Sequence, residues 1–188
     1  PVVVSMGDVA ASGGYWISST ADQIFAEAGT ITGSIGAFAL TATFQDSAGA
    51  LGVTTDGVRT HPLAGATNPF RPLDPGLRTM IQAGIDHTYD AFQARVAEGR
   101  GLAPEVVKGL AEGRVWSGQA AYDLGLVDTL GGLEAAIVEA ARLAELEDYR
   151  VERFTPALSP LEAMLSMALD AVDLGPRPSA GPLGTWLA

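Results

Sequence analysis

The sequence of 188 residues contains no cysteine and a single lysine, Lys108. Without cysteine, the chain cannot form disulfides, use a thiolate as a nucleophile or bind zinc through thiolates. Acidic residues outnumber basic residues by 22 to 11, which gives a net charge of −11, and the basic residues form no cluster. A surface of this charge repels the phosphate backbone, so we exclude nucleic acid as a partner.

The sequence also lacks long apolar runs. No run reaches the roughly 18–20 residues that a membrane-spanning helix needs, and no basic segment followed by an apolar stretch marks a signal peptide. The two histidines and the acidic residues do not show metal-ligand spacing, and the glycine-rich turns lack the lysine of a phosphate-binding loop. We therefore expect no metal and no cofactor.

What the sequence does contain indicates a folded α/β domain with a core, since 47% of its residues are hydrophobic and only 18% are charged. Alternating patterns predict helices that cover a sheet. Strands are predicted at residues 2–5, 23–26, 51–58, 115–116 and 149–154, with a turn-rich segment at 30–36 and an extended one at 37–44. Helices are predicted at residues 14–20, 75–97, 103–111, 117–124, 133–146 and 160–172, and a proline-rich loop at 60–75.

The most informative segment is Ala-Ser-Gly-Gly-Tyr-Trp at residues 11–16, which follows the β-branched run at 2–4. Small residues between a strand and a helix let the backbone turn sharply and expose the hydroxyl of Ser12. A nucleophile for acyl transfer needs such an exposed oxygen, with N–H groups nearby to bind an oxyanion. The alternative is that Ser12 only caps the helix that follows.

Four motifs, taken in order, link the chain to a family. They are PVVVSMG at residues 1–7, ASGGYW at 11–16, TGSIG at 32–36, and VWSGQA at 115–120 with GLVD at 125–128. Together they resemble the signal peptide peptidase A (protease IV) family of serine peptidases, which has a crotonase/Clp-protease-like fold. The resemblance extends to about residue 154, and residues 56–64 resemble the C-terminal half of the long, two-halved form.

The resemblance implies an α/β fold of repeated β-β-α units with the sheet covered by helices. It implies a catalytic half over residues 1–155 and a helix with a Pro/Gly-rich tail, an oligomer contact, over 156–188. Because the sequence begins inside a predicted strand, we expect the chain to be a fragment whose fold is incomplete at the N-terminus.

The resemblance also implies roles for individual residues. Ser12 lies where the family has its nucleophile, and Gly13 where the related Clp-type fold supplies an oxyanion-hole N–H. Ser34 matches the serine that positions a catalytic lysine. In this Ser–Lys dyad the lysine accepts the serine proton, which burial makes possible by lowering the lysine pKa. The apolar character around Tyr15, Trp16, Ile35 and Phe38 predicts a pocket for hydrophobic or small substrate side chains, with Tyr15 and Ile35 as substrate contacts.

The chain departs from the family pattern at the general base, the lysine of the Ser–Lys dyad. Lys108 follows Glu-Val-Val in a short predicted helix, a setting typical of a solvated lysine. Where the short form has its lysine, this chain has Thr60 or a neighbour, and Arg59 does not deprotonate in a protein. We therefore expect the N-terminal half of the same protein to supply the lysine, and this fragment to be inactive alone.

The partners implied by the resemblance are apolar peptides, namely cleaved signal peptides, and further copies of the protein in a homo-oligomer. The implied location is the periplasmic or outer face of the bacterial cytoplasmic membrane, through a segment absent from this chain.

Three alternatives remain open at the level of sequence. His61 or His87 could act as base in a triad with Asp56 or Asp86. The same fold hosts crotonase-type acyl-CoA hydratases and hydrolases. The chain could also be a non-catalytic half-domain that builds a larger assembly.

Overall fold

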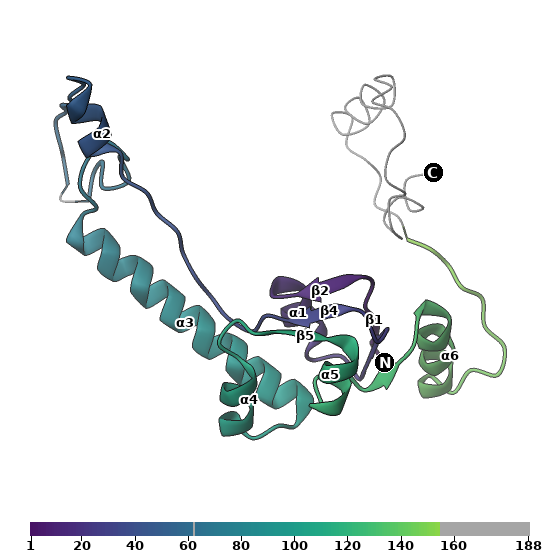
Figure 1. The fold of residues 1–188 in the computed structure, drawn as a ribbon. Helices are drawn as coiled ribbons and strands as arrows, with labels where there is room; N and C mark the ends of the chain where they lie inside the picture. The colour runs from purple at the N-terminus through teal and green to yellow at the C-terminus, as the bar shows by residue number, and fades with distance from the viewer. Residues whose placement is uncertain (62, 155–188) are drawn as a thin grey trace, which may run out of the picture.

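Short strands and helices alternate along the computed structural model, which describes residues 1–61 and 63–154 (Figure 1). The strands are β1 (Val3–Ser5), β2 (Val9–Ala11), β3 (Gln23–Ala26), β4 (Ile31–Gly33), β5 (Val115–Ser117) and β6 (Thr129–Leu130). The helices are α1 (Gly13–Ser18), α2 (Gln45–Ala50), α3 (Pro75–Arg100), α4 (Pro104–Leu110), α5 (Gly118–Asp123) and α6 (Leu133–Leu143). The predicted α/β class is confirmed.

The strands form two three-stranded sheets, in the orders β1-β3-β6 and β2-β4-β5. β1 is parallel to β3, and β2 is parallel to β4, so the successive units β1-β2-α1 and β3-β4-α2 each add one strand to each sheet. β6 then extends the first sheet in parallel, and β5 extends the second in antiparallel orientation. The expected repetition of β-β-α units is thus confirmed. Among the described residues, β1 and β2 are edge strands.

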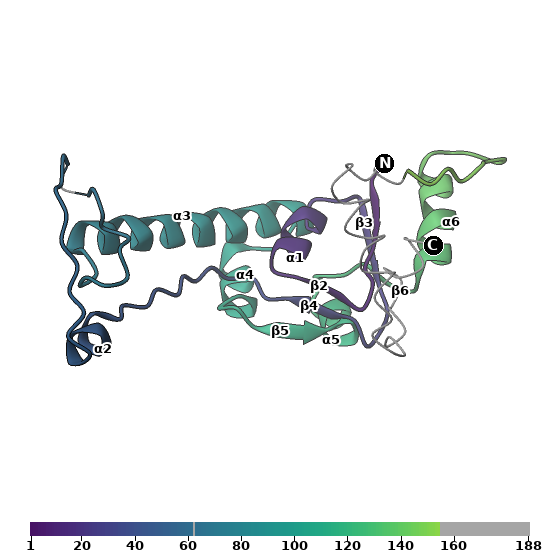
Figure 2. The same ribbon diagram turned by 90° about the horizontal axis from the view of Figure 1, so that it is seen from above.

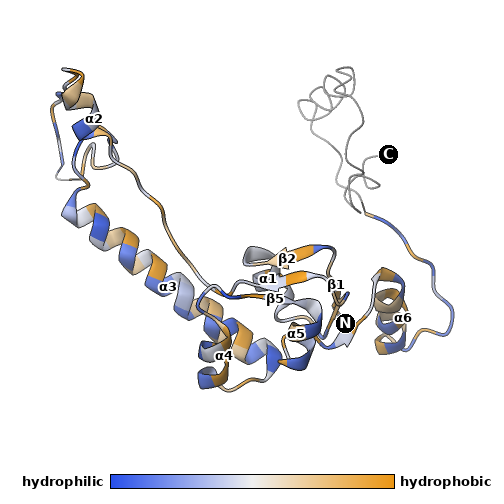
Figure 3. Ribbon diagram, in the orientation of Figure 1, coloured by the Kyte–Doolittle hydropathy of each residue, from blue (hydrophilic) through white to orange (hydrophobic). Residues whose placement is uncertain are grey.

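An arm, made of residues 37–61 and 63–74 with the N-terminal part of α3, projects from the two sheets (Figure 1). Residues 37–44 run away from β4 to α2, and α3 returns along the same side (Figures 1 and 2). α3 begins where Asp74 accepts hydrogen bonds from the N–H groups of Gly76 and Leu77, and it ends at Gly101, whose φ is 60°. Apolar residues occur along the whole arm (Figure 3).

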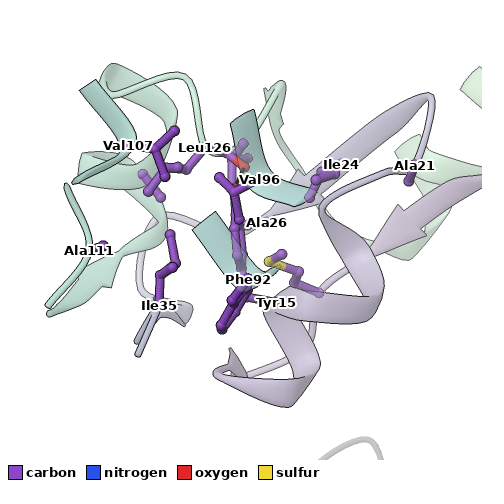
Figure 4. Packing of buried hydrophobic residues seen from close by; sticks show 13 residues of the cluster. Tyr15, Ala21, Ile24, Ala26, Ile35, Phe92, Val96, Val107, Ala111 and Leu126 are labelled. Carbon is purple, nitrogen blue, oxygen red and sulfur yellow. Dashed lines mark hydrogen bonds between the residues drawn. The ribbon is translucent and has the colours of Figure 1, made fainter. Parts of the chain in front are cut away.

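The core lies where the C-terminal end of α3 meets α1 and the sheets (Figure 4). Phe92 and Val96 are the buried residues of α3, and the ring of Phe92 lies 4.8 Å from that of Trp16. Ile24 of β3 is also fully buried. In the described part of the chain no helix is both long and apolar enough to cross a membrane.

Several local predictions were wrong. Residues 51–58 form no strand, because no other strand lies beside them to pair with, and Val58 is almost fully exposed. Residues 149–154 are irregular rather than a strand. Conversely, β4 lies inside the segment predicted as turns, and β2 and α2 were not predicted. The helix expected at 160–172 and the tail assigned to 156–188 lie outside the described residues.

Candidate functional site

Ser12 lies at the sharp turn from β2 into α1. Its φ of 52° and ψ of −116° lie in a region that costs a residue with a side chain about 1–3 kcal/mol. The backbone is fixed on both sides, since the Ser12 N–H donates to the Gly33 carbonyl at 2.8 Å and the Trp16 N–H donates to the Ser12 carbonyl at 2.8 Å. The side chain is exposed and makes no capping hydrogen bond. The Ser12 side chain therefore does not cap the helix.

Ser34 lies beside Ser12. In the parallel pair of β2 and β4, Ala11 is opposite Gly33, so the two serines follow paired residues at the same end of the sheet. Ser34 has a φ of 51°, and its N–H donates to the Arg114 carbonyl at 2.7 Å. Within the described residues neither serine hydroxyl makes a hydrogen bond, so both are available to a further group.

Glycine is required immediately before Ser34. Gly33 has a φ of 75°, and a Cβ at this position would lie 2.7 Å from Cδ1 of Trp116. The indole is itself held in place, because its Nε1 donates to the Leu110 carbonyl at 3.1 Å. β4 can therefore approach β5 this closely only because Gly33 has no side chain. This approach fixes where Ser34 leaves the sheet.

Gly13, the first residue of α1, follows Ser12 and is exposed. Its N–H belongs to the first turn of the helix, where no preceding turn supplies an acceptor. Among the described residues no carbonyl accepts from it. This N–H is therefore free next to the Ser12 hydroxyl.

Tyr15 and Ile35, which the sequence predicted to contact substrate, are fully buried. The Tyr15 hydroxyl donates to the Leu126 carbonyl at 2.8 Å, and burial raises the pKa of this phenol above its ordinary value. The structure thus puts the exposed Ser12 and Gly13 and the half-buried Ser34 at the same end of the β2-β4 pair, and puts Tyr15 and Ile35 in the core.

Within the described residues, the candidate bases lie on other elements than the turn that carries Ser12. Lys108 is exposed on α4, and His87 is exposed on α3. His61 lies between α2 and α3, where its Nδ1 accepts from the N–H of Leu63 at 3.2 Å. Of the acids considered for a triad, Asp86 accepts from Gln82 and Asp56 from the N–H of Gly57. No histidine triad forms, and no group of three side chains suited to a metal occurs in this part of the chain.

A cavity of about 950 Å³ lies between the end of α1 and the C-terminal half of α3, and neither Ser12 nor Ser34 lines it. Its wall includes Arg95, whose guanidinium lies 5.4 Å from the ring of Trp16, and the ion-paired Arg100 and Asp128. Arg100 lies in none of the sequence motifs. The only signal for this pair was the GLVD motif, which ends at Asp128.

Comparison with known proteins supplies a family. Residues 1–147 match Peptidase family S49. Protease 4 of Haemophilus influenzae is 47% identical over 161 residues, which are 82% of this chain and 26% of that protein. Protease 4 of Salmonella typhi is 41% identical over 172 residues, 92% of this chain and 27% of that protein. Serine protease SPPA, chloroplastic, of Arabidopsis thaliana is 36% identical over 149 residues, 78% of this chain and 22% of that protein. The chain spans about a quarter of the length of these relatives.

Proposed function

The chain belongs to peptidase family S49, and we propose on that basis that it carries the nucleophile of a serine peptidase, Ser12. The observation that carries this proposal is the strained turn between β2 and α1, which presents an exposed hydroxyl free of hydrogen bonds beside Ser34. Strain of this kind is costly and is concentrated at functional sites. The strand–turn–helix arrangement is also the one in which hydrolases present a nucleophilic serine.

In the proposed reaction the Ser12 Oγ attacks the carbonyl carbon of a peptide bond, while a neutral lysine accepts the hydroxyl proton. The negative charge that develops on the carbonyl oxygen is stabilised by the free N–H of Gly13. The proton then passes to the leaving amine, and water releases the acyl group from Ser12. Ser34 donates or accepts a hydrogen bond at the lysine amine and keeps it directed at Ser12.

The lysine comes from outside this chain, in the upstream half of the same protein. Two features support this part of the proposal. Lys108, the one lysine of the sequence, is exposed on α4, whereas a lysine acts as a base near neutral pH only when burial lowers its pKa. In addition, β1 and β2 are edge strands of the described sheets, which gives further strands a place to add.

We further propose that the substrates are apolar peptides such as cleaved signal peptides. Residues 37–43 follow Ser34 closely and are extended, and within the described residues their backbone groups make no hydrogen bonds. An extended peptide can pair with such a backbone as an added strand. Phe38 and Leu40, each 91% exposed, would lie beside its side chains. Free backbone groups near the nucleophile favour a peptide substrate over an acyl-CoA thioester.

The proposed assembly is a homo-oligomer, attached to the outer face of a bacterial cytoplasmic membrane through a segment outside this chain. The exposed apolar side chains of the arm support association, because burying them against a partner is favourable. They include Phe38, Leu40, Phe44, Leu51, Val53 and Val58.

The test uses the full-length protein and two serine variants. Ser12→Ala should abolish cleavage of an apolar peptide and covalent labelling by a fluorophosphonate, with the thermal midpoint nearly unchanged. Ser47→Ala, which removes an exposed hydroxyl on α2, should leave both activities at the wild-type level. A Ser12→Ala protein that keeps most of its turnover would refute the assignment of the nucleophile.

A further inference from the structure

The segment from Leu126 to Asp128, which follows α5, binds three other elements at once. The Leu126 carbonyl accepts the hydroxyl of Tyr15 from α1 at 2.8 Å. Asp128 binds Ile24 of β3 twice, donating its N–H to the carbonyl at 3.0 Å and accepting the N–H with its carboxylate at 2.7 Å. The carboxylate is also ion-paired with Arg100, the last residue of α3, whose side chain is only 6% exposed. This segment is therefore fixed to the sheet and to α3.

The Tyr15 hydroxyl is the polar link from the side chains of α1 to this segment. The other hydroxyls at this helix bond locally, Ser18 to the Gly14 carbonyl and Ser19 to the Trp16 carbonyl. Those bonds stabilise helical turns but do not fix the position of α1 relative to the rest of the protein. The Tyr15 bond spans 111 positions in sequence and is buried. A phenol is protonated over the physiological range, and burial raises the pKa of this one further, so the hydroxyl remains a donor.

The position of α1 decides the position of Ser12. Ser12 directly precedes α1 and Tyr15 is the third residue of the helix, so a shift of the helix moves the backbone of Ser12 with it. A nucleophile must lie about 3–3.5 Å from the atom it attacks, and a misplacement of about 1 Å can lower the rate by roughly 100-fold. A buried bond three residues after the nucleophile is well placed to prevent such a shift.

We propose that Tyr15 is a positioning residue for the peptidase reaction, acting through its hydrogen bond to the Leu126 carbonyl to hold α1 and the Ser12 hydroxyl in the attacking geometry. The inference rests on the proposed function, since it gives Tyr15 this task only if Ser12 is the nucleophile. It also gives the GLVD motif a role, as the fixed partner of the helix that carries the site.

The experiment compares Tyr15→Phe with Tyr122→Phe in the full-length protein. Tyr122 lies on α5 and is 45% exposed, so its hydroxyl is not buried against a single partner. Tyr15→Phe should lower kcat and the rate of fluorophosphonate labelling at least tenfold, while KM changes less than twofold and the thermal midpoint falls by a few degrees. Tyr122→Phe should match the wild type. Tyr15→4-aminophenylalanine, which restores a donor, should recover part of the lost rate.

Each other outcome has a distinct meaning. A Tyr15→Phe protein that is folded and labels at the wild-type rate overturns the inference, as does one that fails to fold, because the bond then serves the fold as a whole. Ser12→Ala is measured in parallel. If that variant is still labelled, the proposed function fails, whereas loss of its labelling beside an unaffected Tyr15→Phe overturns only the role of Tyr15.

Discussion

Ser12 and Ser34 follow Ala11 and Gly33, two residues that face each other across neighbouring parallel strands. A single hydrogen bond, from the Ser12 N–H to the Gly33 carbonyl at 2.8 Å, continues the strand pairing to the point where the serines leave the sheet. Both serines have a positive φ, 52° and 51°. Two serines that are 22 positions apart in sequence thus lie at the same end of neighbouring strands.

Replacement of Ser34 should lower activity whatever it does to stability. Both Ser34→Ala and Ser34→Gly remove the hydroxyl, but only glycine relieves the strain of a φ near 51°. We expect both variants of the full-length protein to lose about tenfold or more in kcat, since a base held less well transfers the proton less efficiently. Thermal unfolding should show the glycine variant as the more stable of the two. Wild-type turnover in either variant would remove Ser34 from the site.

Ser12→Gly should be inactive, as Ser12→Ala should be, but more stable than Ser12→Ala. The backbone of Ser12 lies in a region that glycine adopts without a steric penalty, and the penalty for other residues is about 1–3 kcal/mol. The greater entropy of the unfolded glycine chain offsets part of this gain. We therefore expect the free energy of unfolding of Ser12→Gly to exceed that of Ser12→Ala by a net amount of about 1 kcal/mol. Urea denaturation of both variants measures this difference. Alanine as stable as glycine would mean that the turn is unstrained in solution.

The sequence pattern predicted the elements in which apolar residues recur at helical spacing or form a short buried run. The helix predicted at 75–97 is α3, three residues longer at its end, and the strand predicted at 23–26 is β3, because its apolar run is buried. β2 was missed because it has only three residues, among them an exposed valine and two alanines. β2 depends on its pairing with β4, which is distant in sequence, so a pattern read over a few neighbouring residues does not reveal it.

The turns of the candidate site could be predicted from local sequence, but the contact between them could not. The small residues around Ser12 and the TGSIG motif identified two turns from sequence, and strand pairing then brings them together. The substrate contacts predicted at Tyr15 and Ile35 rested on apolar character alone, which does not distinguish a pocket wall from a core. In the structure both side chains lie in the core. The arm was not predicted, since a projecting helix is amphipathic in sequence in the same way as a packed one.

Stability at alkaline pH should report on Tyr15. Burial raises the pKa of this phenol in the folded protein, whereas the unfolded chain has the ordinary value near 10. Below about pH 10 the phenol is protonated in both states, and its contribution to stability does not change. Above that pH the unfolded chain releases the proton first, so stability falls by about 1.4 kcal/mol per pH unit.

The comparison of wild type with Tyr15→Phe isolates this contribution, because every other titrating group is shared. Thermal midpoints measured between pH 8 and pH 11 should fall more steeply for the wild type above pH 10. Tyr122→Phe serves as the control and should follow the wild type, since it removes a phenol hydroxyl from a side chain that is 45% exposed. Parallel curves for wild type and Tyr15→Phe would show that the phenol is not buried in solution.

The source of the general base can be tested with the one lysine of the chain. Lys108 is exposed on α4, whereas a lysine that serves as a general base is a buried one. In the full-length protein, Lys108→Gln should therefore leave kcat and its pH dependence at the wild-type level. The isolated chain of residues 1–188 should cleave no peptide, and addition of the remaining part of the protein should restore cleavage. Loss of activity in Lys108→Gln, or cleavage through Ser12 by the isolated chain, would place the base within these residues and refute a lysine supplied from outside them.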